Sequence, residues 1–213
     1  MHRPTYGSML RASAVTLLLA LAGCATMDRD ECLAVDWRTV GFEDGAAGYA
    51  ADRIGQHRKA CAKHGVTPDL AAYQAGRQEG LREYCVPATG FRLGSQGGSY
   101  GGMCAGDLEP AFLDAYRSGQ QLHTLETRLA NVNYQLDAKR DALQKAESDI
   151  VSRSALAISS EASAEERAQA VVDVKHLGER VGRLKAELRQ LADDRIHCER
   201  DLDDFRATLQ LTP

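Results

Sequence analysis

The chain has 213 residues, 44% hydrophobic and 26% charged, with a formal net charge of −4 at pH 7. Without residues 1–23, which hold two of the 26 basic residues and none of the 30 acidic ones, the net charge becomes −6. So acidic a chain lacks a basic patch. Binding to nucleic acid and electrostatic binding to an anionic membrane surface are therefore excluded as functions. The length suits one compact domain with an extended element, or two small domains.

The first 24 residues have the pattern of an export signal. Arg3 and Arg11 precede a mostly apolar run, 14–21, that is too short to span a bilayer as a mature helix. The sequence LAGC at 21–24 resembles the lipobox of bacterial lipoproteins. The resemblance implies cleavage before Cys24, thioether lipidation of this cysteine and acylation of the new amino terminus. About three acyl chains anchor a protein stably to a membrane.

Residues 1–23 are therefore predicted to be a lipoprotein signal peptide. Ala25, rather than an aspartate, follows the cysteine. By resemblance to lipoprotein sorting, this favours the periplasmic face of the bacterial outer membrane. An ordinary cleaved secretory signal with a chance cysteine is the alternative.

Residues 24–117 differ in composition from the rest of the chain. Fourteen of the 19 glycines lie between Gly41 and Gly106, and nine of the 12 aromatic residues lie between Trp37 and Tyr116. This composition predicts a small helical module that is rich in glycine and aromatic residues. The remainder, 118–213, has a different pattern.

Two helices are expected in this module. Asp36 is a candidate N-cap for a helix over 37–64, and Gly65 is typical of its C-terminal end. A second helix is expected over 68–84, with proline in its first turn.

Glycines recur at helical spacing in both predicted helices. They are Gly41, Gly45 and Gly48 in the first and Gly76 and Gly80 in the second. The segment around the first set aligns without gaps on the segment around the second. Because glycine destabilises a helix by about 1 kcal/mol relative to alanine, such a face indicates close approach of two helix backbones. In the alternative, the glycines mark loops.

Residues 86–108 are glycine-rich and are predicted to be a loop, with Cys85 and Cys104 at its two ends. The stretch at 94–99 lacks the lysine of a phosphate-binding loop, and the next helix start is some ten residues away. A phosphate site is therefore not predicted.

The cysteines agree with export. Cys32, Cys61, Cys85 and Cys104 lie in the small module, where two disulfides are expected in an oxidising compartment. If the two helices fold back on each other at Gly65, Cys61 lies too far from Cys85 to bridge, and the first helix separates Cys32 from Cys61. The predicted pairs are then Cys32–Cys85 and Cys61–Cys104.

Over about residues 24–120, an ordered set of positions resembles the bacterial lipoprotein family numbered 2799 among the domains of unknown function. The resemblance implies an envelope lipoprotein, and it brings no activity. The positions that carry it include Cys32, Trp37, Gly41, Gly45, Gly48, Cys61, Gly65, Pro68, Tyr73, Gly76, Gly80, Tyr84, Cys85, Gly90, Gly94, Tyr100, Cys104, Tyr116 and Gly119.

Residues 118–213 carry two coiled-coil seams, with mostly apolar residues alternating at spacings of three and four. Ser163 and Glu166 form a capping-box pattern at the start of the second helix. The favoured arrangement is a long antiparallel helical hairpin with its turn near residue 158, and the alternative is a parallel oligomer. The seams are Leu122, Leu125, Leu129, Val132, Leu136, Lys139, Leu143, Ala146 and Ile150, then Val174, Leu177, Val181, Leu184, Leu188, Leu191, Arg195, Cys198, Leu202, Phe205 and Leu209.

The predicted fold class is thus mainly α, a disulfide-tied glycine-rich helical module followed by a coiled-coil hairpin. Cys198 is the unpaired cysteine and lies on the second seam. In the hairpin it is expected to face residues around Ser118. In a parallel dimer, two copies of it would meet and could form a disulfide.

Sequence motifs for chemistry are few. His57, Cys61 and His64 share a helix face and are weak metal candidates, but a disulfide at Cys61 is favoured, so neither a metal nor another cofactor is predicted. Glu43, Asp44 and Glu79 are the sole candidates for a carboxylate pair in acid–base catalysis. No catalytic signature is present, and the chain is predicted not to be an enzyme.

The predicted function is that of a lipid-anchored cell-envelope protein of structural or adaptor type. Its expected partners are the membrane, through the N-terminal lipid, and an envelope protein or a second copy, through the coiled coil. The alternative is a glycan- or peptide-binding module or hydrolase with an aromatic platform. That platform would consist of Trp37, Tyr49, Tyr73, Tyr84 and Tyr100, unless these side chains form the core.

Overall fold

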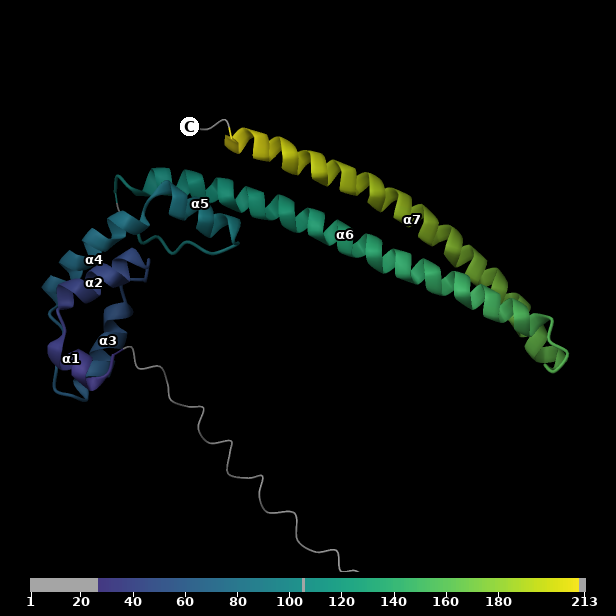
Figure 1. The fold of residues 1–213 in the computed structure, drawn as a ribbon, viewed down its shortest axis with the longest axis horizontal. Helices are drawn as coiled ribbons and strands as arrows, with labels where there is room; N and C mark the ends of the chain where they lie inside the picture. Colours follow the sequence, from purple (N-terminus) through teal and green to yellow (C-terminus); the bar gives the residue numbers. More distant parts are fainter. Residues whose placement is uncertain (1–26, 105, 211–213) are drawn as a thin grey trace, which may run out of the picture. The chain divides into compact units, whose positions relative to one another are not determined.

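The computed structural model describes residues 27–104 and 106–210, which form helices and no strand (Figure 1). Cys24 and Ala25 lie outside the described residues. Within the described ranges, no helix has both the length and the apolar character needed to cross a membrane. The helices are α1 (Arg29–Ala34), α2 (Trp37–Ala46), α3 (Arg53–Ala62), α4 (Leu70–Tyr84), α5 (Pro87–Ser95), α6 (Glu109–Ala157) and α7 (Ala164–Gln210).

The described chain divides into two compact units. Unit 1 runs to Val86 and includes Gly101–Glu109, and unit 2 comprises Pro87–Tyr100 and the residues from Pro110 onward. The domain boundary expected between residues 117 and 118 lies inside the continuous helix α6. The mainly α fold, with disulfides in its N-terminal helical part and a long antiparallel hairpin, is confirmed.

The single helix predicted over 37–64 is wrong. Helix α2 ends at Ala46, and two residues later Gly48 takes a φ of +73°, a left-handed conformation that glycine adopts without strain. The chain then turns, and α3 begins at Arg53. Gly48 continues the spacing of the helical glycines, so this turn is not visible in the periodicity alone.

Helices α2 and α4 pack through their glycines, as predicted. A Cβ atom added to Gly41 would lie 2.0 Å from the Tyr73 carbonyl oxygen, and one added to Gly76 would lie 1.8 Å from the Arg38 carbonyl oxygen. Gly45 and Gly80 meet the facing backbone equally closely. No side chain fits at these positions, so the two backbones are in direct contact.

The direction of this pair differs from the prediction. Gly41 approaches the backbone near Tyr73, and Gly45, one turn later, approaches Arg77, so α2 and α4 run parallel. Helix α3 makes this possible because it carries the chain back before α4 begins. The predicted antiparallel fold-back at Gly65 is therefore wrong, although the register of the gapless sequence alignment matches the packing.

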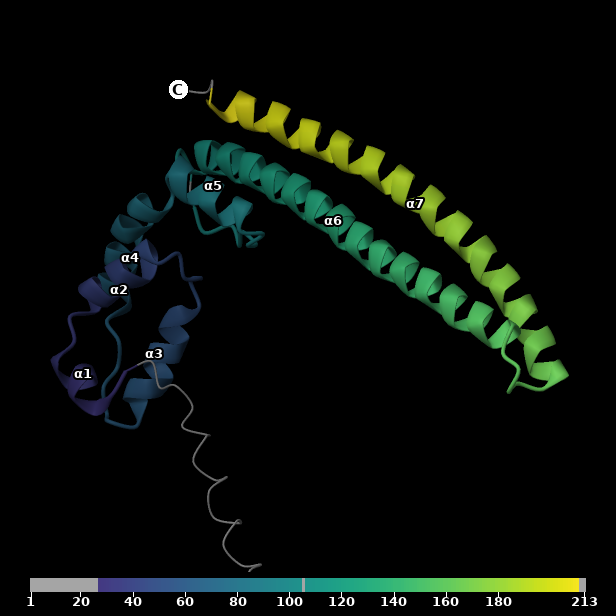
Figure 2. The ribbon, with the colours of Figure 1, turned by 45° about the vertical axis from the view of Figure 1, so that its right-hand side comes forward.

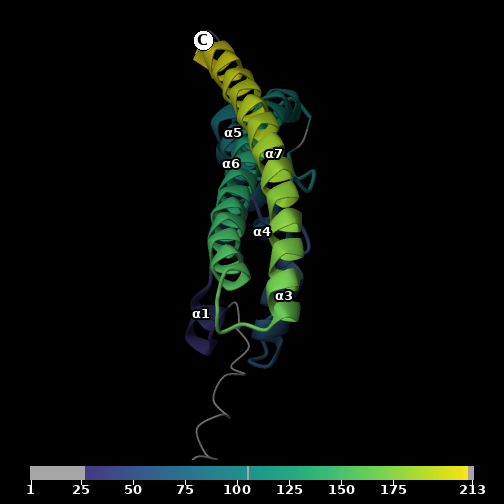
Figure 3. The same cartoon turned by 90° about the vertical axis from the view of Figure 1, so that its right-hand side faces the viewer.

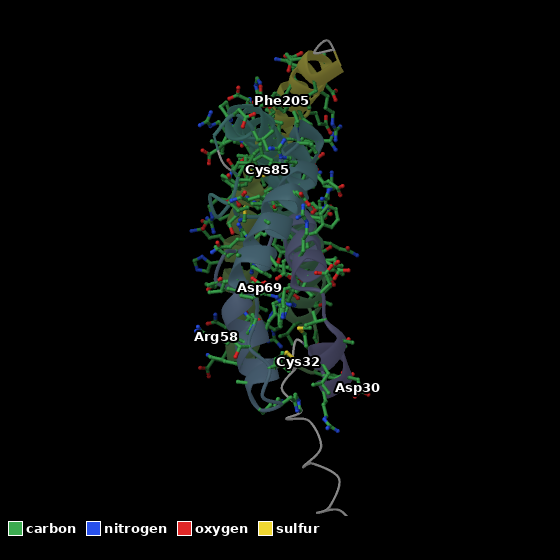
Figure 4. All side chains as sticks on the ribbon, turned by 90° about the vertical axis from the view of Figure 1, so that its left-hand side faces the viewer. Asp30, Cys32, Arg58, Asp69, Cys85 and Phe205 are labelled. Atoms are coloured by element: carbon green, nitrogen blue, oxygen red, sulfur yellow. A yellow bond between two sulfur atoms is a disulfide. The ribbon has the colours of Figure 1, made fainter. Side chains whose placement is uncertain are left out.

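The disulfides join Cys32 to Cys61 and Cys85 to Cys104, with Cα–Cα distances of 5.4 and 5.6 Å. The predicted pairs, Cys32–Cys85 and Cys61–Cys104, are wrong. They assumed that one long helix separated the first two cysteines, whereas α3 is a separate helix that brings Cys61 back beside α1. Figure 4 shows the yellow sulfur atoms beside the label of Cys32.

The loop predicted over 86–108 is wrong in its first half, where α5 forms. Pro87 occupies its first position, which suits proline. Its glycines serve close packing against the start of α6: a Cβ on Gly94 would lie 2.1 Å from the Tyr116 carbonyl oxygen, and one on Gly119 would lie 2.2 Å from that of Phe91. A high glycine content had suggested a loop, but here it allows two helices to touch.

The α5–α6 pair repeats the α2–α4 pair. Adding 49 to the residue number maps the Gly-Phe-x-x-Gly pattern at 41–45 onto the same pattern at 90–94. Gly48 is likewise equivalent to Gly97, and both have a positive φ. The backbone hydrogen bonds repeat as well, from Tyr49 N–H to the Asp44 oxygen and from the N–H of residue 98 to the oxygen of residue 93, both 2.9 Å long.

The second helices of the two pairs, α4 and α6, are related to each other by adding 39 to the residue number. Gly80 and Gly119 are then equivalent, and Tyr73 corresponds to Phe112. A Cβ at Gly41 would meet the carbonyl of Tyr73, and one at Gly90 would meet that of Phe112. Each unit therefore contains one copy of a parallel, glycine-packed helix pair.

In unit 2, α6 and α7 lie side by side and antiparallel (Figures 1, 2 and 3). Every predicted seam residue is buried or partly buried, which confirms both seams. At the turn, Ser163 and Glu166 form the predicted capping box, and hydrogen bonds from Ser163 lower the pKa of Glu166 below its ordinary value. Ion pairs such as Lys139–Glu187 and Lys185–Glu147 join the two helices.

The position expected for Cys198, opposite Ser118, is wrong. Cys198 is 2% exposed and packs with Val132 and Leu136. The turn is asymmetric: Arg153, four residues before the end of α6, pairs with Asp173, nine residues after the start of α7. The start of α7 extends past the end of α6, which shifts every facing pair.

Candidate functional site

A buried polar cluster joins α2, α3 and α4 in unit 1. Asp44 and His57 are only 6% and 4% exposed. Asp44 Oδ2 accepts a hydrogen bond from the hydroxyl of Tyr73 at 2.6 Å and lies 2.9 Å from His57 Nε2. One carboxylate oxygen thus connects three helices.

The local folding of each helix explains this geometry. Asp44 precedes Gly45 in the glycine face of α2, so it lies where α2 and α4 are in closest contact. Tyr73, on the first turn of α4, is 1% exposed. Burial, together with its hydrogen bond to Asp44, raises the pKa of Tyr73 above its ordinary value, so this phenol stays protonated and donates.

Arg53 extends the cluster towards the surface. Its Nε lies 3.9 Å from Asp44 Oδ1, and its guanidinium carbon lies 4.4 Å from the centre of the Tyr49 ring. Within the described part of the chain, Arg53 Nε and His57 Nδ1 are buried and have no hydrogen-bond partner. The cluster therefore keeps unused hydrogen-bonding capacity.

The cluster borders a cleft of about 600 Å³ formed by the segment from Met27 to His57. Four carboxylates line it, from Glu31, Asp36, Glu43 and Asp44, whereas Arg53 is its one lysine or arginine. The lining is therefore strongly acidic.

The second helix pair lacks this cluster. The residues equivalent to Asp44 and Tyr73 are Leu93 and Phe112, which are both apolar. Phe112 is fully buried, at 0% exposure, and contacts the rings of Tyr100 and Tyr116. The parallel glycine-packed pair thus forms with an apolar contact at this place, so its packing does not require a buried carboxylate.

The weak metal candidates do not form a ligand set. Cys61 is oxidised in its disulfide with Cys32, and His57 is hydrogen-bonded to Asp44. In the described ranges, no three His, Cys, Asp or Glu side chains are placed to hold a metal ion.

The acids named as candidates for acid–base catalysis have different partners. Glu79 forms an ion pair with Arg38 on the surface. Asp44 instead points into the cluster with His57 and Tyr73. Asp44 and Glu79 are therefore engaged in separate interactions on the two packed helices.

Of the five aromatic residues of the alternative platform, two are core residues. Trp37 and Tyr73 are buried in the core of unit 1, at 8% and 1% exposure. Tyr100 belongs to unit 2, where it packs on Phe112. Of the proposed set, Tyr49 alone lines the cleft, at 46% exposure.

The link between Asp44, His57 and Tyr73 was missed by sequence reasoning. These residues are 13 and 29 positions apart and form no known motif. A signal was nevertheless present: the Gly-Phe-x-x-Gly pattern at 41–45 recurs at 90–94, with aspartate before its second glycine in one copy and leucine in the other. A polar replacement inside a repeated packing motif is a detectable cue.

Replacing Tyr73 by phenylalanine is expected to destabilise unit 1 by about 2 kcal/mol, because it removes a hydrogen bond to a buried carboxylate. Because the pKa of Tyr73 is raised in the folded state, its contribution is fully present below pH 10.0, the ordinary tyrosine value, and is lost as the pH rises beyond it. Urea unfolding at pH 8 and above pH 10 measures both effects.

Tyr134→Phe is the matched control, because Tyr134 is 76% exposed. Wild type should lose stability above pH 10 more steeply than Tyr73→Phe, whereas Tyr134→Phe should follow wild type. Parallel losses in wild type and Tyr73→Phe would contradict the assignment.

The comparisons with known proteins concern the part of the chain that holds the glycine-packed helix pairs. No curated protein and no solved structure matches the chain significantly. Residues 36–121 match the family model described as "Protein of unknown function (DUF2799)". The match begins at the N-cap of α2 and ends just after Gly119, so it spans both glycine-packed helix pairs. Over these residues the chain is therefore similar to the DUF2799 family.

Proposed function

We propose that this chain is a lipid-anchored protein of the bacterial outer membrane, on its periplasmic face, that acts as an adaptor and not as an enzyme. The lipobox-like sequence ending in Cys24 supports the anchor. The two disulfides fit an oxidising, extracytoplasmic compartment. The adaptor role rests on the hairpin of unit 2.

The observation that carries this proposal is the apolar surface near the turn between α6 and α7. Ile158 is 86% exposed, Val151 70% and Val171 59%. The rest of the hairpin closes on itself through its seams and ion pairs, so these side chains are not needed to hold the arms together. Exposed apolar side chains on both sides of one turn are a candidate protein-binding surface.

A groove of about 710 Å³ runs beside this surface. Leu156 and Leu177 contribute its apolar part, and Lys145, Arg153 and Asp173 its charged part. A partner that covers the exposed valines and Ile158 would find apolar contacts there, beside charged side chains that already pair as Arg153–Asp173 and Lys145–Asp149. The proposed partner is an envelope protein bound at the turn.

The anchor is tested by metabolic labelling with a palmitate analogue. We expect the wild type to be labelled and Cys24→Ala to be unlabelled, because the thioether and the new amino terminus both require Cys24. Cys198→Ala, which removes the buried free thiol, should be labelled like wild type. Equal labelling of wild type and Cys24→Ala would reject the anchor.

The adaptor role is tested by a photo-crosslinking amino acid placed at residue 158 in living cells. We expect a discrete crosslinked species larger than the monomer. The same amino acid at residue 134, also exposed (76%) but in the middle of α6, is the control. Absence of a crosslink at residue 158, or the same products from both positions, would overturn the proposal.

A further inference from the structure

Unit 1 keeps a charged group where unit 2 keeps an apolar one. Asp44 is buried, whereas its counterpart Leu93 packs the same kind of helix pair without a charge. Burying a carboxylate costs free energy unless it is paired and hydrogen-bonded. Since packing does not require Asp44, the polar cluster points to a role beyond folding.

The adjoining cleft favours a cation. Glu31 and Asp36 are already engaged in capping α1 and α2. Glu43 is exposed on the cleft and makes no ion pair in the described part of the chain. The ring of Tyr49 and the carboxylate of Asp44 already approach one cation, the guanidinium of Arg53, without a hydrogen bond between Arg53 Nε and Asp44. Carboxylates beside an aromatic face form a favourable environment for an organic cation.

The buried Nδ1 atom of His57, which has no hydrogen-bond partner in the described structure, also points to a ligand. The side chain of His57, 6% exposed, lines the cleft. In the neutral ring that donates from Nε2 to Asp44, Nδ1 is a lone-pair acceptor, and this buried atom has no donor in the described structure. An ammonium group brings three N–H donors and one positive charge.

We propose that the cleft of unit 1 binds the ammonium group of an amine-bearing ligand, with Asp44 and Glu43 balancing its charge and His57 as the unpartnered acceptor. The ligand is a free amine or a lipid headgroup that carries the same ammonium. This proposal goes beyond the adaptor role of the hairpin and does not depend on it.

The test uses residues 25–213, which include every described residue, and a ¹H–¹⁵N NMR titration at constant ionic strength. The probes are ethanolamine hydrochloride and its neutral counterpart, ethylene glycol. We expect ethanolamine to produce saturable shifts in resonances of α1, α2 and α3, and ethylene glycol to produce none.

Glu43→Gln should raise the apparent Kd for ethanolamine about three- to tenfold, as expected for loss of one partly solvated charge. The matched control is Glu83→Gln, which removes the same charge from an exposed position of α4 outside the cleft and should leave the Kd unchanged. Because both glutamates are exposed, neither variant is expected to unfold.

Vesicles distinguish the two sources of the ammonium. If phosphatidylethanolamine vesicles perturb the same resonances and phosphatidylglycerol vesicles do not, the ligand is a lipid headgroup. If ethanolamine alone does so, it is a free amine. Shifts that do not saturate with any amine, equal shifts with ethylene glycol, or equal weakening by Glu43→Gln and Glu83→Gln would overturn the proposal.

Discussion

Alanine in place of Gly76 is expected to destabilise unit 1 by about 3 kcal/mol or more, because overpacking a rigid contact forces the backbone to move. The added Cβ would lie 1.8 Å from the carbonyl oxygen of Arg38 and 3.0 Å from the nitrogen of Phe42. Both are backbone atoms of α2, so no side-chain rotation relieves the clash. The helices must separate, and the neighbouring contacts at Gly41 and Gly80 open with them.

The second helix pair offers an internal comparison. Alanine occurs naturally at the equivalent position, Ala115, and there a Cβ on Gly90 would lie 2.4 Å from the facing carbonyl oxygen, against 2.0 Å at Gly41. The second pair is therefore slightly wider at this place, although one turn later it is closer, with 2.1 Å at Gly94 against 2.3 Å at Gly45. We expect unit 1 to tolerate Gly76→Ala only by a similar separation, which its buried Asp44 cluster opposes.

Gly55→Ala in α3 is the matched control. A Cβ at Gly55 would meet nothing within 4 Å, so alanine should stabilise the helix there by up to about 1 kcal/mol. Urea unfolding followed by the fluorescence of Trp37, the one tryptophan of the chain, measures both variants. If Gly76→Ala were as stable as Gly55→Ala, the direct backbone contact would be refuted.

Replacing Cys32 and Cys61 together by alanine is expected to destabilise unit 1 by about 3–4 kcal/mol. The bond closes a loop with a sequence separation of 29 and so restricts the unfolded chain. Both residues are also fully buried, at 1% and 0% exposure, in the core cluster with Trp37 and Tyr73. Loss of the bond therefore loosens the packing of the core and raises the conformational entropy of the unfolded chain.

The measurement compares urea unfolding of the double variant with that of wild type, with and without reductant. Reductant should lower the stability of wild type, because both bonds are then open, and should lower that of the double variant less. Peptide mapping of the variant should still find Cys85 joined to Cys104. A double variant as stable as oxidised wild type would show that the Cys32–Cys61 bond contributes nothing to the fold.

Local patterns in the sequence were enough to predict several parts of this protein. The spacing of Leu136, Cys198 and their neighbours predicted both seams of the hairpin, because a helix places residues three and four apart on one face. Ser163 and Glu166 predicted the start of α7, since a capping box involves only one turn of chain. The glycines at 41, 45, 76 and 80 predicted a backbone contact for the same reason.

Only the tertiary structure decided the direction in which the glycine faces of α2 and α4 meet. One left-handed residue, Gly48, turned a predicted long helix into α2 and α3, which made the glycine pair parallel and brought Cys61 to Cys32. The contact between Asp44, His57 and Tyr73 likewise exists only because α3 returns beside α2. Periodicity reports the faces of each helix, whereas the pairing of faces depends on chain reversals whose direction a single residue can change.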